Sequence, residues 1–418
     1  MNCSIWVSGM VFAGSALSSF YANADFLKDT KASLDTRNFY MNRDFRQDNA
    51  PQSKAEEWAQ GFLLRYESGF TAGTVGFGFD ALGLVGVKLD SSPDRSGSGL
   101  LLRDRESPRR AQDEYGELGV TAKMRISKTV LKVGTLTPKL PLLQANDSRL
   151  LPQTFRGGQL NSLEVLGLTV DAGRLTKVNQ RDSTDNEDIS ISTVGVKNFK
   201  PQQLASNNFD FASFSYKWTD QLTAGYGYGH LDNVYDQHVF TLNHVAPLSG
   251  GSTFKSDVRF ARSTELSSSQ VDNRALEAMF TYTLGSQAFG LGHQRMSGDS
   301  GYAYISGTDA FLVNFVQVND FANVSERSWQ ARYDYNFAAM GLPGLTFMTR
   351  YLTGDNIDLG ANRPEGKEWE RDTDIAYVIQ GGPLKNVGIK WRNATVRSTN
   401  FGSDIDENRL ILSYSIPL

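Results

Sequence analysis

The sequence predicts an all-β fold, a transmembrane antiparallel up-and-down β-barrel of about 18 strands with a constriction loop folded into its lumen. Three observations lead to this class: apolar and polar residues alternate, short turns alternate with long polar connections, and the chain closes on an amphipathic strand. The 418 residues have a mean hydropathy of −0.37 and contain no apolar run of about 18 residues that could cross a bilayer as a helix. A barrel accommodates this length because its size is set by strand number.

The closing strand shows the alternation most clearly. One face carries Leu410, Leu412, Tyr414, Ile416 and Leu418, and the other carries Arg409, Ile411, Ser413 and Ser415. A strand with one apolar and one mixed polar face separates two environments. An edge strand of a soluble sandwich would show the same pattern, so the rest of the chain must decide between the two.

The same two-faced pattern recurs along the chain. It is found in residues 117–126, 276–284, 329–337 and 387–392. In each segment the face opposite the apolar residues is mostly polar, and in most segments it carries Lys or Arg. That face is too polar for a filled interior, so we expect lipid outside the barrel and water inside it.

The connections also alternate, in length. Short turns are expected near residues 127–128, 219–220, 285–287 and 381–383, and long polar stretches at 91–115, 138–162, 298–308 and 354–373. Short turns on one side and long loops on the other are the plan of bacterial outer-membrane barrels. The segments around 176–207 and 233–252 do not resolve into clear strands.

The first 24 residues predict a secretory signal peptide. They carry no charge, they include an apolar stretch, and they end in Ala22-Asn23-Ala24, which resembles a cleavage site. No Lys or Arg precedes the apolar stretch, which departs from the usual pattern. We expect a signal peptide at residues 1–24 and a barrel domain at 25–418. The single cysteine, Cys3, falls in the leader, so this domain can form no disulfide.

The segment 138–162 is the candidate constriction loop, and it contains Arg149 and Arg156. A connection of this length in an ordered protein usually has a function. We interpret it as a loop folded into the lumen, and the alternative is a solvated outer loop.

Basic residues dominate the face assigned to the lumen. They are Lys123, Arg125, Lys132, Lys217, Lys255, Arg259, Arg332, Arg350, Lys390, Arg392 and Arg409, against the acids Glu67, Glu117, Asp257, Glu277 and Asp334. Barrel closure would set Arg37 and Arg43, near the N-terminus, beside the last strands, although the orientation of their strand is ambiguous. Because positive rings in a pore favour anions, we expect an anion-selective pore.

The sequence gives only weak evidence for other functional classes. Residues 298–301, Gly-Asp-Ser-Gly, resemble the nucleophile segment of trypsin-like proteases, but none of the four His stands in a recognisable protease context. An outer-membrane hydrolase therefore stays a remote alternative, and we expect no enzyme. We expect no cofactor and no metal site, although the acidic stretch 182–188 leaves a Ca²⁺ site open beside the simpler reading of a solvated loop.

Several segments together resemble the OprD family of substrate-specific porins. They are residues 25–27, 37–44, 74–78, 149–154, 328–334, 343–348 and 409–411. These matches span the predicted barrel domain. The resemblance implies a single 18-stranded barrel, an inward-folded third loop and a ladder of basic residues that guides a substrate carboxylate through a narrow eyelet.

The resemblance also assigns residues. By position, the ladder would include Arg43, Lys390, Arg392 and Arg409, with Lys390 where the family commonly has Arg, which weakens bidentate carboxylate binding. Members that take basic amino acids have an acidic, tyrosine-rich wall opposite the ladder. Here Tyr304 and Asp320 match that wall and Asp309 lies near it, whereas other wall positions differ. The differences are Val318 for a tyrosine, Phe315 for a serine and Thr308 for an aspartate.

The less acidic wall favours a carboxylate with an apolar or aromatic body, as in the benzoate branch of the family. We therefore expect passive, selective uptake of small carboxylates such as benzoate or vanillate across the outer membrane of a Gram-negative, pseudomonad-like bacterium. The alternatives are a channel for basic amino acids and a general diffusion porin. Expected partners are the carboxylate, membrane lipid and the barrel-assembly machinery. We expect a monomer or weak homotrimer, and no nucleic acid.

Overall fold

The computed structural model describes residues 23–200 and 204–418. The predicted signal peptide, residues 1–24, lies almost wholly outside the described residues, so it stays a prediction. None of the helices in the described part of the chain is long and apolar enough to cross a membrane.

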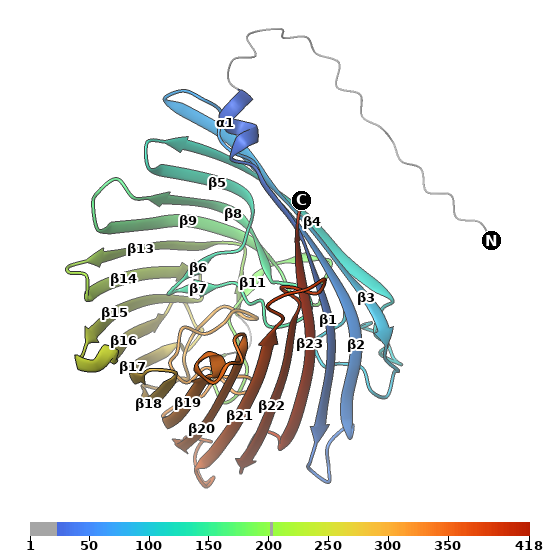
Figure 1. Ribbon diagram of the computed structural model, residues 1–418. Coiled ribbons are helices and arrows are strands. Elements are labelled where there is room, and N and C mark those ends of the chain that lie inside the picture. Colours follow the sequence, from blue (N-terminus) through green and yellow to red (C-terminus); the bar gives the residue numbers. More distant parts are fainter. Residues whose placement is uncertain (1–22, 201–203) are drawn as a thin grey trace.

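A closed antiparallel barrel accounts for most of the described residues (Figure 1). Its 18 strands are β1 (Lys31–Phe45), β2 (Lys54–Glu67), β3 (Val75–Asp90), β4 (Glu114–Ile126), β5 (Thr129–Leu136), β8 (Thr154–Ser162), β9 (Leu168–Asn179), β13 (Phe209–Lys217), β14 (Leu222–Leu231), β15 (Tyr235–Pro247), β16 (Thr253–Glu265), β17 (Asp272–Leu284), β18 (Gln287–Ser297), β19 (Arg327–Asn336), β20 (Leu345–Ile357), β21 (Gly366–Val378), β22 (Gly388–Thr399) and β23 (Ile405–Pro417). The predicted fold class is confirmed.

Short elements complete the described structure. They are α1 (Asn23–Lys28), β6 (Lys139–Leu140), β7 (Leu143–Gln144), β10 (Asn186–Glu187), β11 (Ile189–Ser190), β12 (Ala205–Ser206), and the 3-10 helices η1 (Ser249–Gly251) and η2 (Phe337–Met340). β10 extends the barrel sheet beside β9, whereas β6–β7 and β11–β12 form two separate two-stranded sheets within the loops.

The first and last strands close the barrel. β1 pairs with β23 in an unbroken antiparallel register from Ser33↔Pro417 to Phe45↔Ile405. The start of β1 and the end of β23 therefore lie at the same end of the barrel, where the two-residue turns 127–128 and 285–286 also lie. By the plan of outer-membrane barrels this end faces the periplasm, and the long loops at the other end face the exterior.

The predicted outer faces are confirmed. On β4, Leu118 and Val120 are exposed, and on β17 Leu276 and Phe280 are exposed, whereas Glu277 between them is buried. On β23, Leu410 and Leu412 face outward and Arg409 faces inward with an exposed side-chain fraction of 1%. An exposed apolar belt around the barrel suits contact with lipid tails.

Three predicted loops have different bounds. The connection 137–153 (loop L3) ends at β8, so residues 154–162 of the predicted loop are strand. The stretch 354–373 is mostly strand, because β20 runs to Ile357 and β21 begins at Gly366. The connection after β18 (loop L7, 298–326) is much longer than predicted. The connection after β9 (loop L4, 180–208) occupies the segment that the sequence pattern left unresolved.

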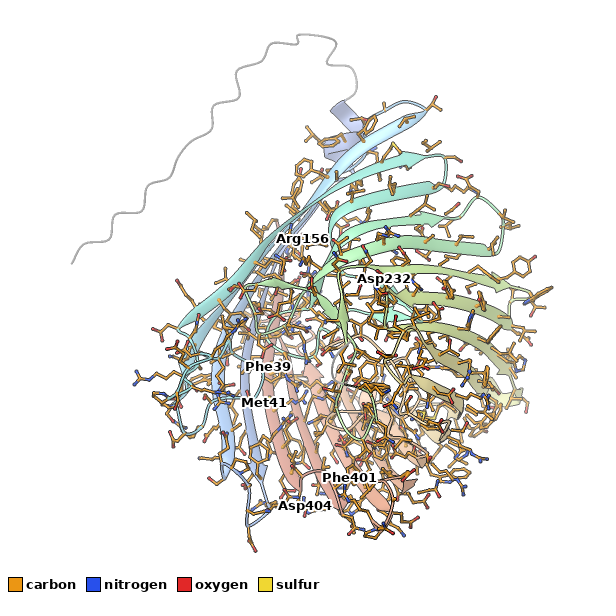
Figure 2. The ribbon with its side chains drawn as sticks, turned by 180° about the vertical axis from the view of Figure 1, so that it is seen from behind. Phe39, Met41, Arg156, Asp232, Phe401 and Asp404 are labelled. Atoms are coloured by element: carbon orange, nitrogen blue, oxygen red, sulfur yellow. The ribbon has the colours of Figure 1, made fainter. Side chains whose placement is uncertain are left out.

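The interior is more filled than predicted. β1 turns Phe39 and Met41 into the lumen, where both are buried (Figure 2). They pack against Leu150 and Leu151 of L3. This packing explains why apolar residues share the inner face with Arg37 and Arg43: they form the platform on which L3 rests. The polarity of the inner faces predicted water inside the barrel, and the apolar packing beneath L3 is an addition that this pattern did not indicate.

A second, larger apolar cluster holds the other inner loops. Inward-facing residues of β13 and β15, including Phe209 and Tyr235, pack against Leu143 of L3, Ile191 of L4 and Ile305 of L7. The burial of large apolar side chains, at about 25 cal/mol per Å² of area, stabilises the loops inside the barrel. Three loops are thereby fixed around one narrow passage.

Candidate functional site

The three inner loops and two barrel strands enclose a cavity of about 290 Å³, referred to below as the eyelet cavity. Its charged and aromatic lining residues are Arg149, Arg181, Tyr304, Asp309, Phe315, Asp320, Arg392 and Arg409. L3 supplies Arg149, L4 supplies Arg181, L7 supplies the Tyr304 wall, and β22 and β23 supply the remaining arginines. The structure thus brings together six residues that the sequence singled out: Arg149, Tyr304, Asp309, Asp320, Arg392 and Arg409.

Arg409 is held by two contacts. Its Nε donates to Glu407 Oε1 at 2.6 Å, and its Nη2 donates to the backbone oxygen of Gln317 in L7 at 3.1 Å. Arg43 donates to the other oxygen of Glu407, at 2.8 Å from Nε. Arg43 therefore supports Arg409 through their shared carboxylate, and it does not itself line the eyelet cavity.

Arg392 stands next to Arg409 in the barrel wall. The two residues are register partners across β22 and β23. Arg392 Nε donates to both oxygens of Asp374 at 3.1 Å, and Lys390 Nζ contacts the same carboxylate at 3.0 Å. Since a guanidinium has five N–H donors, Arg392 and Arg409 each keep donors for a ligand in the cavity.

Arg149 projects from L3 and is buried. Its Nε has no hydrogen-bond partner in the protein, and Nη1 makes only long contacts of 3.4 and 3.5 Å with Ser148. Burial, together with the positive charges of Arg409 and Arg181, lowers the pKa of Arg149. The surroundings therefore disfavour this positive charge, and an anion in the cavity would relieve that cost.

Sequence reasoning missed Arg181. Its Nη1 donates to Asn146 Oδ1 and to Ser148 Oγ, both at 2.9 Å, so it bridges L4 to L3. It precedes the acidic stretch 182–188, whose composition predicts a solvated loop. Only the path of L4 into the lumen places this guanidinium at the cavity.

The wall opposite the arginines is less acidic than its residue types suggest. Asp320 accepts hydrogen bonds from Lys197 Nζ and from Tyr304 OH, each at 2.9 Å. Lys197 and Asp320 are both buried, so the lysine neutralises the carboxylate directly. Phe315 and Val318 add apolar surface to the same wall.

Asp309, the second acid of the wall, lies beside L3. Its carboxylate accepts a hydrogen bond from the Asn146 side chain, and its backbone N–H donates to the oxygen of Gln144 at 3.0 Å. Burial raises the pKa of Asp309 to about 6, although the charges of Arg181 and Arg149 act in the opposite direction. This carboxylate is therefore mostly ionised at neutral pH and takes up its proton in mildly acidic solution.

The other predicted residues lie elsewhere. Arg37 donates from Nη1 to Asp147 Oδ1 at 2.9 Å and to backbone oxygens of Arg149 and Leu150, so it anchors L3. Arg350 is paired with Asp372 at 2.7 Å, away from the cavity. Arg156 was predicted in the constriction loop, but it lies on β8 because the loop ends before that strand (Figure 2).

The prediction that few acids face the lumen is wrong. β21 turns Glu368, Glu370, Asp372 and Asp374 inward, and all four are buried. The sequence pattern assigned most of this segment to a loop, so its acids were placed outside. Glu370 accepts hydrogen bonds from the backbone N–H groups of Val318 and Asn319 at 2.9 and 2.8 Å and so holds L7 in the lumen.

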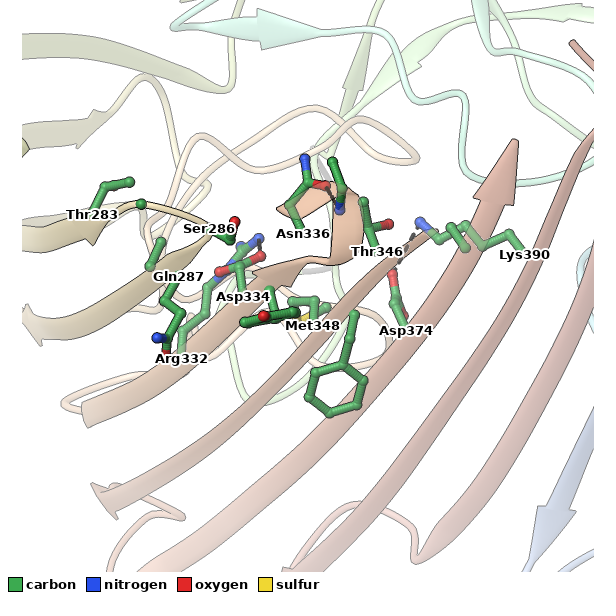
Figure 3. A pocket seen from close by; sticks show the side chains of 16 residues that line it. Thr283, Ser286, Gln287, Arg332, Asp334, Asn336, Thr346, Met348, Asp374 and Lys390 are labelled. Atoms are coloured by element: carbon green, nitrogen blue, oxygen red, sulfur yellow. Dashed lines mark hydrogen bonds and ion pairs between the residues drawn. The ribbon is translucent and has the colours of Figure 1, made fainter. Parts of the chain in front are cut away.

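A second cavity, of about 580 Å³, opens toward the periplasmic end (Figure 3). Lys390 lines it together with Arg332 and Asp334, which pair at 2.8 Å. The side chain of Lys390 is 41% exposed there. Lys390 therefore belongs to the wider passage below the eyelet cavity.

A closed 18-stranded barrel whose inner loops narrow the lumen to a charged cavity is an outer-membrane porin. Residues 24–418 match the family described as outer membrane porin, OprD family. The chain belongs to the OprD family, and it is a porin of the outer membrane and not an enzyme.

Relatives from Pseudomonas support this assignment. The crystal structure of OpdQ from Pseudomonas aeruginosa is 62% identical with a TM-score of 0.88, covering 95% of this chain and 100% of that chain. The structure of Pseudomonas aeruginosa OpdK with vanillate is 38% identical with a TM-score of 0.86, covering 94% of this chain and 100% of that chain. The porin-like protein GalP of Pseudomonas putida is 38% identical over 407 residues, 94% of this chain and 93% of the relative.

Proposed function

We propose that this porin takes up small carboxylates by passive diffusion, and that aromatic acids such as benzoate or vanillate are its preferred substrates. The observation that carries this proposal is the convergence of Arg149, Arg181, Arg392 and Arg409 on one cavity. Arginine forks match the geometry of a carboxylate. The unpartnered Nε of Arg149 offers a further donor.

The opposite wall supports the aromatic part of the proposal. A basic amino acid would need an ionised acid there for its cationic end. Asp320 is neutralised by Lys197, and Asp309 lies near the positive charges of Arg181 and Arg149, which disfavour a second cation beside it. Phe315 and Val318 instead present apolar surface, which suits an aromatic ring. The related OpdK, whose structure holds vanillate, agrees with this substrate class.

The proposed basic ladder has two parts, one at the narrow eyelet cavity and one in the wider cavity below it. Arg392 and Arg409 bind the carboxylate at the eyelet cavity, and Lys390 and Arg332 receive it in the cavity below. Arg43 and Arg37 act as positioning residues, the first through Glu407 and the second through L3. Conduction requires binding that is weak enough to allow release, and several sites in series meet this condition.

Single-channel currents of the purified porin in planar bilayers test the substrate. We expect benzoate and vanillate to interrupt the chloride current at lower concentrations than arginine does. If arginine interrupts the current at lower concentrations, the channel serves basic amino acids. If none of the three interrupts it, the protein is a general diffusion porin.

We also propose that residues 1–24 are removed as a signal peptide and that barrel-assembly machinery recognises the closing strand. Its outward residues Leu410 to Leu418 form the apolar edge on which such recognition would rest. The proposed assembly is a monomer or a weak homotrimer. The mass of the mature protein and its mass in detergent test these statements.

A further inference from the structure

The outer surface of the barrel carries three exposed arginines near its extracellular end, referred to below as the rim arginines: Arg274 on β17, Arg295 on β18 and Arg327 on β19. They point away from the lumen, since each shares its face with an exposed apolar residue of its own strand, namely Leu276, Leu291 or Trp329. They therefore play no part in the eyelet cavity.

The guanidinium groups of the rim arginines have no direct partner in the described protein. Among the residues that the structure describes, no side chain forms a hydrogen bond or ion pair with the guanidinium group of any of the three. Asp355 is the register partner of Arg327, but the two form no ion pair. Arg262, which stands opposite Arg274, is paired with Asp272.

Their arrangement brings like charges together, and a bound anion would offset the repulsion between them. Arg295 and Arg327 are direct register partners, and like charges directly opposite each other destabilise a sheet. Arg274 pairs with Ser297, two residues from Arg295, which places it on the diagonal at roughly 7–8 Å. Three long guanidinium side chains at these separations can converge on a single tetrahedral anion.

The neighbouring residues indicate the level of the rim arginines relative to the membrane. Trp329 follows Arg327 on the same face of β19, is 52% exposed and contacts the ring of His293 at 4.1 Å between centroids. Tryptophan is enriched where a membrane surface meets water. The exposed Leu276 and Leu291 continue toward the membrane interior. The rim arginines therefore stand at the level of lipid headgroups.

We propose that the rim arginines bind a phosphate group of a lipid in the outer leaflet, whose acyl chains lie along Leu276, Leu291 and Trp329. Arginine is suited to phosphate because its planar fork donates two parallel hydrogen bonds. The apolar residues below select a lipid over a soluble anion. This site is separate from the substrate pathway, so a test of lipid binding does not depend on which substrate the porin takes up.

Native mass spectrometry of the full-length folded porin in detergent tests the site. Bisphosphorylated lipid A, the same lipid without its phosphates, and inorganic phosphate serve as probes. We expect only the phosphorylated lipid to stay bound. In the double variant Arg295→Gln/Arg327→Gln we expect its affinity to fall about 10- to 30-fold, as expected for two surface cations near a lipid headgroup.

A matched control removes two exposed arginines of the connection 91–113 at the same end of the barrel, in Arg109→Gln/Arg110→Gln. Heat-modifiable migration on gels verifies that each variant forms a barrel. Equal lipid binding by the rim variant and the wild type overturns the proposal, as does equal binding of the dephosphorylated lipid. Binding of inorganic phosphate in place of the lipid also contradicts it, because the site would then be an anion site without lipid selectivity.

Discussion

Arg392 and Arg409 stand directly opposite each other across β22 and β23, and both face the lumen. A different carboxylate holds each of them: Asp374 lies 3.1 Å from Arg392 and Glu407 lies 2.6 Å from Arg409. These carboxylates offset the repulsion expected of like charges in a direct pair. The wall thus keeps two guanidinium groups adjacent, with donors left for a passing carboxylate.

Arg409→Gln should weaken interruption of the current by benzoate about 10-fold, the loss expected when a charge-assisted hydrogen bond is removed. Concentration series of benzoate in planar bilayers measure this effect. Arg350→Gln is the control, because it removes a lumen-facing arginine that does not line the eyelet cavity. Equal losses in the two variants would mean that the general charge of the lumen, and not the cavity, sets the affinity.

Arg37→Ala should loosen L3, because this side chain contacts Asp147 and two backbone oxygens of the loop. Loss of a hydrogen bond to a charged group costs about 1.5–3 kcal/mol of loop docking. We expect higher conductance and weaker discrimination between benzoate and arginine. The control is Arg65→Ala, whose side chain pairs with Asp35 and forms no hydrogen bond or ion pair with the described residues of L3. Unchanged conductance in the Arg37 variant would show that apolar packing alone holds the loop.

Lys197→Met should make the wall more acidic, because Asp320 would lose the buried cation at 2.9 Å. Current interruptions should then shift in favour of arginine over benzoate. Lys217→Met is a control that removes a lysine paired with Asp220 at the periplasmic end. A shift of equal size in both variants would contradict the neutralising role of Lys197. Barrel formation must be verified first, since an unpaired buried charge is destabilising.

Anion selectivity should increase as the pH falls through about 6, where Asp309 takes up a proton. Its raised pKa means that the carboxylate is mostly charged at pH 7.5 and mostly neutral at pH 5. Protonation removes a negative charge beside Arg149 and Arg181. Reversal potentials in a KCl gradient measure the effect, because neither ion titrates in this range.

The variant Asp309→Asn separates this group from other titrating residues. It should show high anion selectivity at both pH values. A pH response as large as that of the wild type would assign the effect to another group, such as Glu326, whose pKa burial raises to about 7.

The local sequence pattern predicted the barrel, and together with the family resemblance it predicted many residues of the site. Alternation along 410–418 and 276–284 predicted which face meets lipid, and exposed Leu410 and Leu276 confirm it. The family resemblance led to Arg392, Arg409 and the Tyr304 wall. Strand boundaries were harder to predict. The sequence of β21 is so rich in charged residues that it resembles a polar loop, and only its pairing with β20 and β22 identifies it as a strand.

Alternation, closure and the outward apolar belt are properties of the sequence itself, because a period of two residues separates the faces of any strand. Which charges meet is decided by tertiary structure, since register across strands and the path of each loop bring distant residues together. Glu407 joins Arg43 to Arg409, Lys197 neutralises Asp320, and L4 brings Arg181 to the cavity. The sequence determined a barrel with basic residues inside it, and the fold decided which of them remain available to a substrate.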